Sequence, residues 1–250
     1  PNLHPDLPLA ERIDRQGFTA SDIEMVNADS TAIQIILESF FSYHKTSRGQ
    51  RVAAALMAAV RHCDFSTAAP EEILRRMIDA AKDLMSADRG TLWLLDSDRQ
   101  ELWTQIQFED RQVRELRIKV GEGFAGGVAQ SYEPLNIPFD LYEHPTSDRA
   151  QATDAISGYR ICSLLCMPIL NPDGELIGVT QLVNKKKAGH YSELPLVYDQ
   201  PVPELYRASF DDSDQKCLYI FNTQVGVIIQ NIELLAAVRQ QEQVLRGNTP

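Results

Sequence analysis

Two apolar segments joined by a turn constrain the fold of this chain more than any other feature. Residues 161–170 form an apolar run of strand length, and residues 176–183 alternate in character before Asn184 and Lys185. Residues 171–174 read Asn-Pro-Asp-Gly, a turn in which proline presets φ, aspartate bonds locally and glycine supplies a positive φ. The pattern predicts two neighbouring strands in a buried sheet.

Periodicity predicts helices before this strand pair and further strands beside it. Apolar residues at helical spacing predict helices over residues 31–44 and 51–62 and from Pro70 onward. Alternating apolar residues then predict three short strands, over residues 91–96, 102–108 and 113–120. Helices followed by a meander of strands indicate an α+β fold, with a central antiparallel sheet flanked by helices.

The C-terminal part of the chain predicts one long helix. Asp212 or Ser213 is placed to cap it, and the helix is expected from Asp214 to about Arg246. Its apolar residues follow a three-four spacing up to Leu235, and the remainder is polar enough to leave the body of the domain. Such a helix suits a parallel dimer seam or a signalling stalk.

These patterns divide the chain into consecutive parts. We expect an N-terminal segment, N-terminal helices, a globular domain with a surface insertion, and a helix end or linker, over residues 1–29, 30–66, 67–235 (insertion 186–209) and 236–250. The insertion has three prolines and no clear period, and it is expected to be mobile at its tip.

Composition excludes several classes of function. The formal net charge of −11 disfavours a general nucleic-acid binder, because phosphate backbones reward clustered lysine and arginine. No apolar run is long enough to span a membrane, and no signal peptide is visible at the N-terminus. The 4 cysteines and 5 histidines show no metal-binding spacing. Cys162 and Cys166 are expected on one face of a strand, about 13 Å apart, as free thiols in a reducing cytoplasm.

Residues 121–126 read Gly-Glu-Gly-Phe-Ala-Gly, which matches a dinucleotide-binding pattern in isolation. A dinucleotide fold next requires a parallel strand that ends in an acidic residue about 20 positions later. Residues 133–149 contain three prolines and no strand pattern, which disfavours this fold, and no Gly-Lys-Ser/Thr follows, which excludes a P-loop. The glycines then form either a plain strand-to-helix turn or an anion site at the start of a helix over residues 124–131.

Several short motifs in order resemble the GAF domains of cyclic-nucleotide phosphodiesterases and cyanobacterial adenylyl cyclases. They are SGYR at residues 157–160, LCMPI at 165–169, IGV at 177–179, and Asn-Lys followed by Phe-x-x-x-Asp. The resemblance covers roughly residues 70–235 and implies a GAF-like fold. It also implies a supporting clasp behind the ligand, without direct ligand contact, made by Asn184, Lys185, Phe210 and Asp214.

The resemblance further implies a set of ligand-binding positions. Thr91 matches a small hydroxyl residue that faces the purine, Phe108 an aromatic that stacks on it, and Glu109 the acidic position that reads the base edge. Phe108 is also explained by core packing alone.

The same likeness implies three further positions. Phe124 and Ala125 match helix-start residues whose N–H groups bind the cyclic phosphate, and Ser157 matches a residue that touches the ligand. Ile161 departs from a second threonine of the phosphodiesterase pattern. The long segment over residues 134–157 is expected to be a loop that covers the ligand.

The sequence is interpreted as a non-catalytic, cytoplasmic regulatory domain. It is expected to bind a cyclic nucleotide, cAMP in preference to cGMP, with no cofactor or metal, and to form a homodimer through its terminal helices. Signals would pass to an output domain such as a nucleotide cyclase or a phosphodiesterase. The alternatives are a ligand-free dimerisation module, and a GAF domain that senses another small molecule or holds a bilin chromophore.

Overall fold

The computed structural model describes residue 47, residues 49–56 and 58, and residues 70–107, 113–192 and 194–247. The chain separates into two compact units, Pro1–Arg48 and Gly49–Pro250, and the fold below is that of the second. Residues 49–56 and 58 are helical, in agreement with the helix predicted there. The segment expected over residues 1–29 and the helix expected over residues 31–44 lie outside the described residues.

One antiparallel sheet of six strands forms the centre of the domain, in the order β3-β2-β1-β6-β5-β4. The strands are β1 Ala87–Asp96, β2 Glu101–Gln107, β3 Val113–Lys119, β4 Leu135–Ile137, β5 Leu164–Leu170 and β6 Leu176–Lys185. The predicted hairpin is β5–β6, at the centre of the sheet, and β6 also pairs with β1. The α+β fold with a central antiparallel sheet is therefore confirmed.

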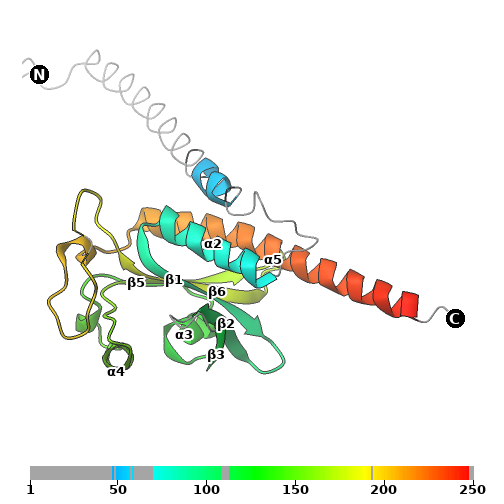
Figure 1. The fold of residues 1–250 in the computed structure, drawn as a ribbon, viewed down its shortest axis with the longest axis horizontal. Helices are drawn as coiled ribbons and strands as arrows, with labels where there is room; N and C mark the ends of the chain where they lie inside the picture. The colour runs from blue at the N-terminus through cyan, green and yellow to red at the C-terminus, as the bar shows by residue number, and fades with distance from the viewer. Residues whose placement is uncertain are drawn as a thin grey trace, which may run out of the picture. The chain divides into compact units, whose positions relative to one another are not determined.

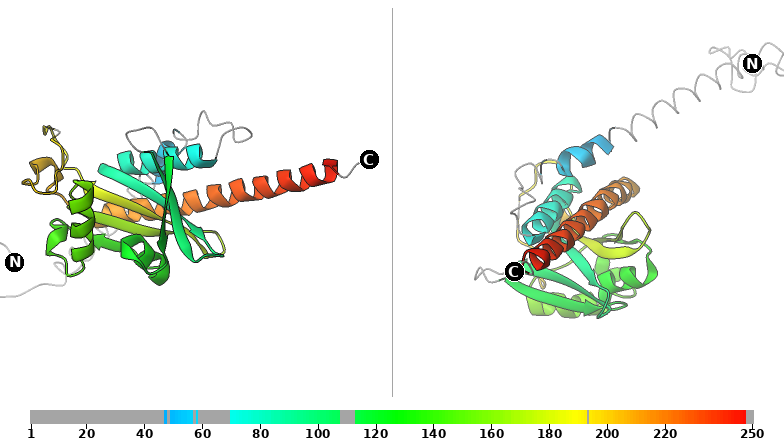
Figure 2. Two further views of the ribbon diagram at one scale, coloured as in Figure 1. Left: turned by 60° about the horizontal axis from the view of Figure 1, so that its bottom comes forward. Right: turned by 90° about the vertical axis from the view of Figure 1, so that its right-hand side faces the viewer.

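Helices cover both faces of this sheet (Figure 1). The long helices α2 and α5 lie side by side on one face, and α3 and α4 lie on the other side, where they share a core. Their bounds are α2 Pro70–Leu84, α3 Gly123–Ser131, α4 Asp148–Ser157 and α5 Asp212–Gly247. Figure 2 shows that α5 continues beyond the sheet toward its C-terminal end, as the sequence predicts.

Side chains of the sheet alternate between two apolar cores, because successive residues of a strand point to opposite faces. In β1, Leu92 and Leu94 pack toward α2 and α5, whereas Trp93 packs toward α3. In β5, Leu165 and Cys166 divide in the same way. The continuous apolar run of β5 is thus explained by burial on both faces.

The α5 helix approaches the sheet so closely that Gly226 has no room for a side chain. A Cβ atom there would lie 2.2 Å from the carbonyl oxygen of Leu170 in β5. Any larger residue would push the helix away from the strand.

The prediction of one long loop over residues 134–157 is wrong. This segment contains β4, a short 3₁₀ helix η2 (Leu141–Glu143) and α4. The periodicity of α4 is weak because only Ala150 and Asp154 of this helix are buried. A helix without an apolar stripe gives no signal to a pattern search.

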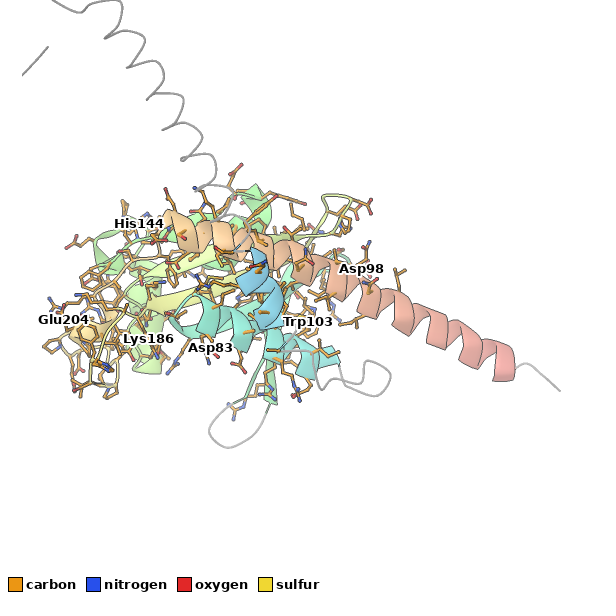
Figure 3. The ribbon with its side chains drawn as sticks, turned by 90° about the horizontal axis from the view of Figure 1, so that it is seen from above. Asp83, Asp98, Trp103, His144, Lys186 and Glu204 are labelled. Atoms are coloured by element: carbon orange, nitrogen blue, oxygen red, sulfur yellow. The ribbon has the colours of Figure 1, made fainter. Side chains whose placement is uncertain are left out.

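The insertion over residues 186–209 is more ordered than its composition predicts. It contains a 3₁₀ helix η3 (Glu204–Tyr206) and a small core formed by Leu196, Val202, Leu205 and Tyr206 around Cys162. Its two ends lie together, where Lys187 N–H donates to the Leu205 carbonyl at 2.8 Å; the adjacent Lys186 and Glu204 are labelled in Figure 3.

The expectation that Cys162 and Cys166 share one strand face is wrong. β5 begins at Leu164, so Cys162 precedes the strand and packs with the insertion, whereas Cys166 packs beneath α3. Both are buried free thiols; Cys217 is buried as well, and Cys63 lies outside the described residues. Within the described part of the chain, no helix combines the length and apolarity that crossing a membrane requires.

Candidate functional site

The N-terminus of α3 presents backbone donors that the helix itself does not use. The Gly126 N–H makes the first helical bond, to the Glu122 carbonyl at 3.1 Å. The amides of Gly123, Phe124 and Ala125 precede that bond, and the Glu122 side chain does not cap them. Free amides at the positive end of a helix dipole favour an anion. The anion-site interpretation of the glycine turn is therefore geometrically available.

A pocket of about 660 Å³ opens between α3 and α4. Most of its lining is apolar, and its facing walls include Phe124 and Gly127 from α3 and Arg149 and Thr153 from α4. Ile161 closes one side. The volume lies within the roughly 300–1,000 Å³ that small-molecule pockets occupy. The pocket and the α3 amides together define the candidate site.

The structure brings only part of the predicted ligand-binding set into this pocket. Phe124 lines it, and Ala125 is buried in the core behind the first turn of α3. Thr91 lies in β1 opposite Gln181, and neither it nor Ser157 is among the described lining residues. Phe108 and Glu109, predicted to stack on and read the base, lie outside the described residues. 

Ser157 is the last residue of α4 rather than part of a loop. Its Oγ accepts a hydrogen bond from the Tyr159 N–H at 3.3 Å, at the point where the helix ends at Gly158. Gly158 has a positive φ of 72°, as helix-terminating glycines often do. Ser157 therefore shapes the exit from α4.

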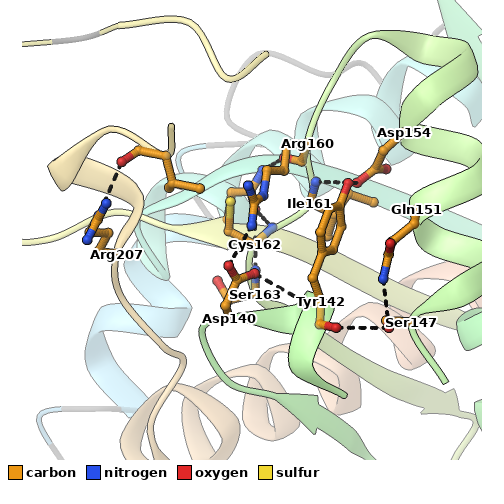
Figure 4. Close-up of polar contacts among 12 residues, drawn as sticks. Asp140, Tyr142, Ser147, Gln151, Asp154, Arg160, Ile161, Cys162, Ser163 and Arg207 are labelled. Carbon is orange, nitrogen blue, oxygen red and sulfur yellow. Dashed lines mark hydrogen bonds and ion pairs between the residues drawn. The ribbon is translucent and has the colours of Figure 1, made fainter. Parts of the chain in front are cut away.

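A buried polar network docks α4 onto the domain (Figure 4). The Asp154 side chain is 1% exposed, and one of its oxygens accepts from the Tyr142 hydroxyl at 2.8 Å and from the Ile161 N–H at 2.7 Å. Arg160 donates to Asp140 at 2.5 Å and stacks over the Tyr142 ring at 4.4 Å. Sequence reasoning missed this network because its members lie in the segment expected to be a loop and just after it.

Burial raises the pKa of the Asp154 carboxyl above its ordinary value, although its hydrogen bonds to Ile161 and Tyr142 oppose this. The folded protein therefore disfavours ionisation of Asp154. The contribution of Asp154 to the stability of the folded protein is fully present below the pKa of the carboxyl in the unfolded chain, about 3.9. This contribution is lost as pH rises through the higher pKa of the folded state.

Asp154→Asn is expected to remove this pH dependence, because a single amide oxygen can accept both hydrogen bonds without carrying a charge. Chemical denaturation from about pH 4 upward should show the variant gaining stability relative to the wild type. Asp154→Ala should instead lose about 2 kcal/mol, because it leaves two buried donors unpaired. An unchanged pH dependence in Asp154→Asn would contradict the assignment.

Lys185 and Asp214 form an ion pair at 2.7 Å, as their positions at a strand end and a helix start predict. Lys185 Nζ also donates to the Met85 carbonyl at 2.8 Å and lies 5.7 Å from the centre of the Phe210 ring. Both charged side chains are mostly buried. The contact thus joins β6, the end of α2 and the start of α5. None of these residues is among the described lining of the pocket.

Asn184 holds the chain between α4 and β5. It is fully buried and has a positive φ of 61°, which asparagine tolerates better than most residues. Its side-chain oxygen accepts from Cys162 N–H at 2.6 Å, and its amide nitrogen donates to the Tyr159 hydroxyl at 2.7 Å and the Arg160 carbonyl at 2.9 Å. The residue that directly precedes Lys185 therefore fixes the segment that leads out of α4.

The described residues contain no cluster of three or more histidine, cysteine, aspartate or glutamate side chains suited to a metal ion. Burial raises the pKa of Cys162 to about 12, so this thiol is protonated near neutral pH. The site geometry suits a bound small molecule held by backbone donors and an apolar wall.

Residues 69–229 match the family model described as GAF domain. Because this match spans more than half of the chain, the chain belongs to the GAF domain family. The fold, the resemblance of its motifs and the match agree.

Two curated relatives are cyclic-nucleotide phosphodiesterases by name. The chain is 30% identical over 168 residues to dual 3',5'-cyclic-AMP and -GMP phosphodiesterase 11A of Takifugu rubripes, covering 63% of this chain and 16% of the relative. It is 34% identical over 138 residues to dual 3',5'-cyclic-AMP and -GMP phosphodiesterase 11 of Drosophila melanogaster, covering 49% and 9%. The chain thus spans a small part of each relative.

A solved structure supports the fold independently. The GAF domain of a phosphoenolpyruvate-protein phosphotransferase from Coxiella burnetii superposes with a TM-score of 0.53 at 20% identity, covering 76% of this chain and 98% of that one. At this identity the likeness concerns the fold.

Proposed function

We propose that this chain is a regulatory sensor domain that binds a cyclic nucleotide in the pocket between α3 and α4. The observation that carries the proposal is the position of the uncapped N-terminus of α3 at an apolar pocket of about 660 Å³. A cyclic nucleotide combines one anionic phosphate with a large, flat base. The amides of residues 123–125 suit the first part and the apolar walls suit the second.

The remaining predicted contacts belong to this proposal. Thr91, Phe108 and Glu109 are proposed to contact the base, Ser157 to touch the ligand, and Phe124 and Ala125 to bind the phosphate through their N–H groups. The preference for cAMP over cGMP is likewise proposed; both nucleotides appear in the names of the relatives. The domain is proposed to act in the cytoplasm without catalysing a reaction.

The proposed signal is a population shift between two positions of α4. A ligand that contacts α3 and α4 together favours the docked position of α4. Asn184 holds the chain that leaves α4, and the adjacent Lys185 pairs with Asp214 in the first turn of α5. These contacts offer a continuous connection from the pocket to α5, and from there to an output domain outside this chain.

Thermal unfolding of the whole chain, after exhaustive dialysis, tests the proposal with cAMP, cGMP and 5'-AMP added separately. A ligand at about 100 times its dissociation constant adds roughly 2.7 kcal/mol, which raises the melting temperature by a few degrees. We expect a shift with a cyclic nucleotide, larger for cAMP, and none with 5'-AMP. Equal melting temperatures in all four samples would contradict the proposal and favour a ligand-free module.

We also propose a homodimer through the terminal helices. Tyr219, Val227 and Leu234 are exposed on α5 at spacings that place them along one side of the helix. Sedimentation equilibrium should show a dimer, and Leu234→Glu should weaken it. A monomer at every concentration tested would exclude this arrangement.

A further inference from the structure

We infer that Arg149 binds the phosphate of the ligand, and that its ion pair with Glu122 is the contact that the ligand replaces. This inference rests on the proposed function and assigns the charged group that the pocket uses. It adds a side-chain contact to the backbone donors of α3.

The ion pair lies at the pocket and joins its two walls. Arg149, in the first turn of α4, donates through Nη2 to Oε1 of Glu122, the residue that precedes α3. Arg149 itself lines the pocket. The pair thus connects α4 to the turn that supplies the free amides of α3.

Arg149 is the one lysine or arginine among the described lining residues. The other basic side chain there, His144, has its Nδ1 2.9 Å from the hydroxyl oxygen of Thr146. Among the described lining residues, an anion that enters this pocket therefore meets one permanent cation, Arg149, beside one carboxylate, Glu133. The planar guanidinium offers paired N–H donors that match a phosphate as well as they match a carboxylate.

Arg149 can exchange Glu122 for a phosphate at little cost in stability. The side chain of Arg149 is 63% exposed and that of Glu122 is 38% exposed, and an ion pair that is open to water contributes little to stability. Glu122 also accepts from the Lys119 N–H at 3.3 Å, so it keeps one partner when Arg149 leaves. A phosphate at the start of α3 would be repelled by the negative charge of Glu122. Arg149 would offset this repulsion when it leaves Glu122 and pairs with the phosphate.

Glu122 should consequently compete with the ligand for Arg149. Removing the charge of Glu122 frees the arginine and removes the repulsion, so affinity should increase. Removing the charge of Arg149 should lower affinity. Because the contact is electrostatic, this loss should be smaller at high salt, whereas the loss of a purely structural contact would not depend on salt.

Isothermal titration of cAMP and cGMP into the full chain tests the inference. We expect about a tenfold weaker dissociation constant for Arg149→Gln, a smaller loss for Arg149→Lys, and about threefold tighter binding for Glu122→Gln. At high salt the difference between wild type and Arg149→Gln should shrink. The matched controls are Glu72→Gln and Arg75→Gln, an exposed ion pair on α2, which should leave affinity unchanged.

Two results would overturn the inference while the proposed function stands: wild-type binding that Arg149→Gln leaves unaltered, or weaker binding in Glu122→Gln. The absence of wild-type binding to either nucleotide would overturn the inference and the proposed function together. The two failures are therefore distinguishable in one series of titrations.

Discussion

Asn184→Ala is expected to lower the free energy of unfolding by about 4 kcal/mol. The substitution removes the acceptor of the Cys162 N–H and the donor to the Tyr159 hydroxyl and the Arg160 carbonyl. The Cys162 N–H and the Arg160 carbonyl lie in a fully or partly buried region, where each unpaired polar group costs about 1–3 kcal/mol, whereas the Tyr159 hydroxyl keeps its hydrogen bond to Asp88 at 2.7 Å. Alanine also tolerates a φ of 61° less well than asparagine does. Urea denaturation measures the change directly.

Asn184→Gly separates the two contributions to this loss. Glycine accepts the positive φ without strain but makes none of the side-chain hydrogen bonds. The glycine variant should therefore be more stable than the alanine variant by about 1 kcal/mol, and still far less stable than wild type. A loss below about 1 kcal/mol in both variants would show that the observed hydrogen bonds contribute little to stability.

Gly127→Phe is expected to abolish ligand binding without unfolding the domain. Gly127 lines the pocket, and a Cβ atom built there meets nothing within 4 Å. A phenylalanine side chain can therefore enter the pocket and occupy the space proposed for the nucleotide. Helix propensity favours the change, so the melting temperature should not fall. Affinity for cAMP and cGMP should decrease at least about 100-fold, or roughly 2.7 kcal/mol.

Ile156→Phe is the matched control for this substitution. Ile156 is 89% exposed on α4 and is not among the described lining residues. The Ile156→Phe substitution adds an aromatic ring to α4 outside the pocket, and it should leave affinity within about twofold of wild type. If Gly127→Phe binds as tightly as wild type, the nucleotide does not occupy the space between α3 and α4.

Elements with a strong local signal could be predicted from the sequence. β5 and β6 have long apolar stretches around a turn with a defined mechanism, and α5 has a three-four spacing of apolar residues. The pairing of Lys185 with Asp214 followed from their positions at a strand end and a helix start. In each of these cases the residues that form the structure are close in sequence or match a recognised order of motifs.

The elements that were missed depend on contacts between distant residues. α4 buries only Ala150 and Asp154, and the insertion is held by its contact with Cys162, so neither shows a periodic pattern. For the same reason Arg149 was missed as a pocket residue, since a polar residue in an expected loop carries no signal. The predicted roles of Phe108 and Glu109 stay predictions.

Direct titration of the dialysed chain with cAMP, beside the Gly127→Phe variant, tests the central claim most directly. The account predicts one saturable site per chain in the wild type, with a heat signal that disappears in the variant while its melting temperature is maintained. Cyclic nucleotide binding that is equal in both proteins would contradict the assignment of the pocket. No binding by the wild type would contradict the sensor function itself.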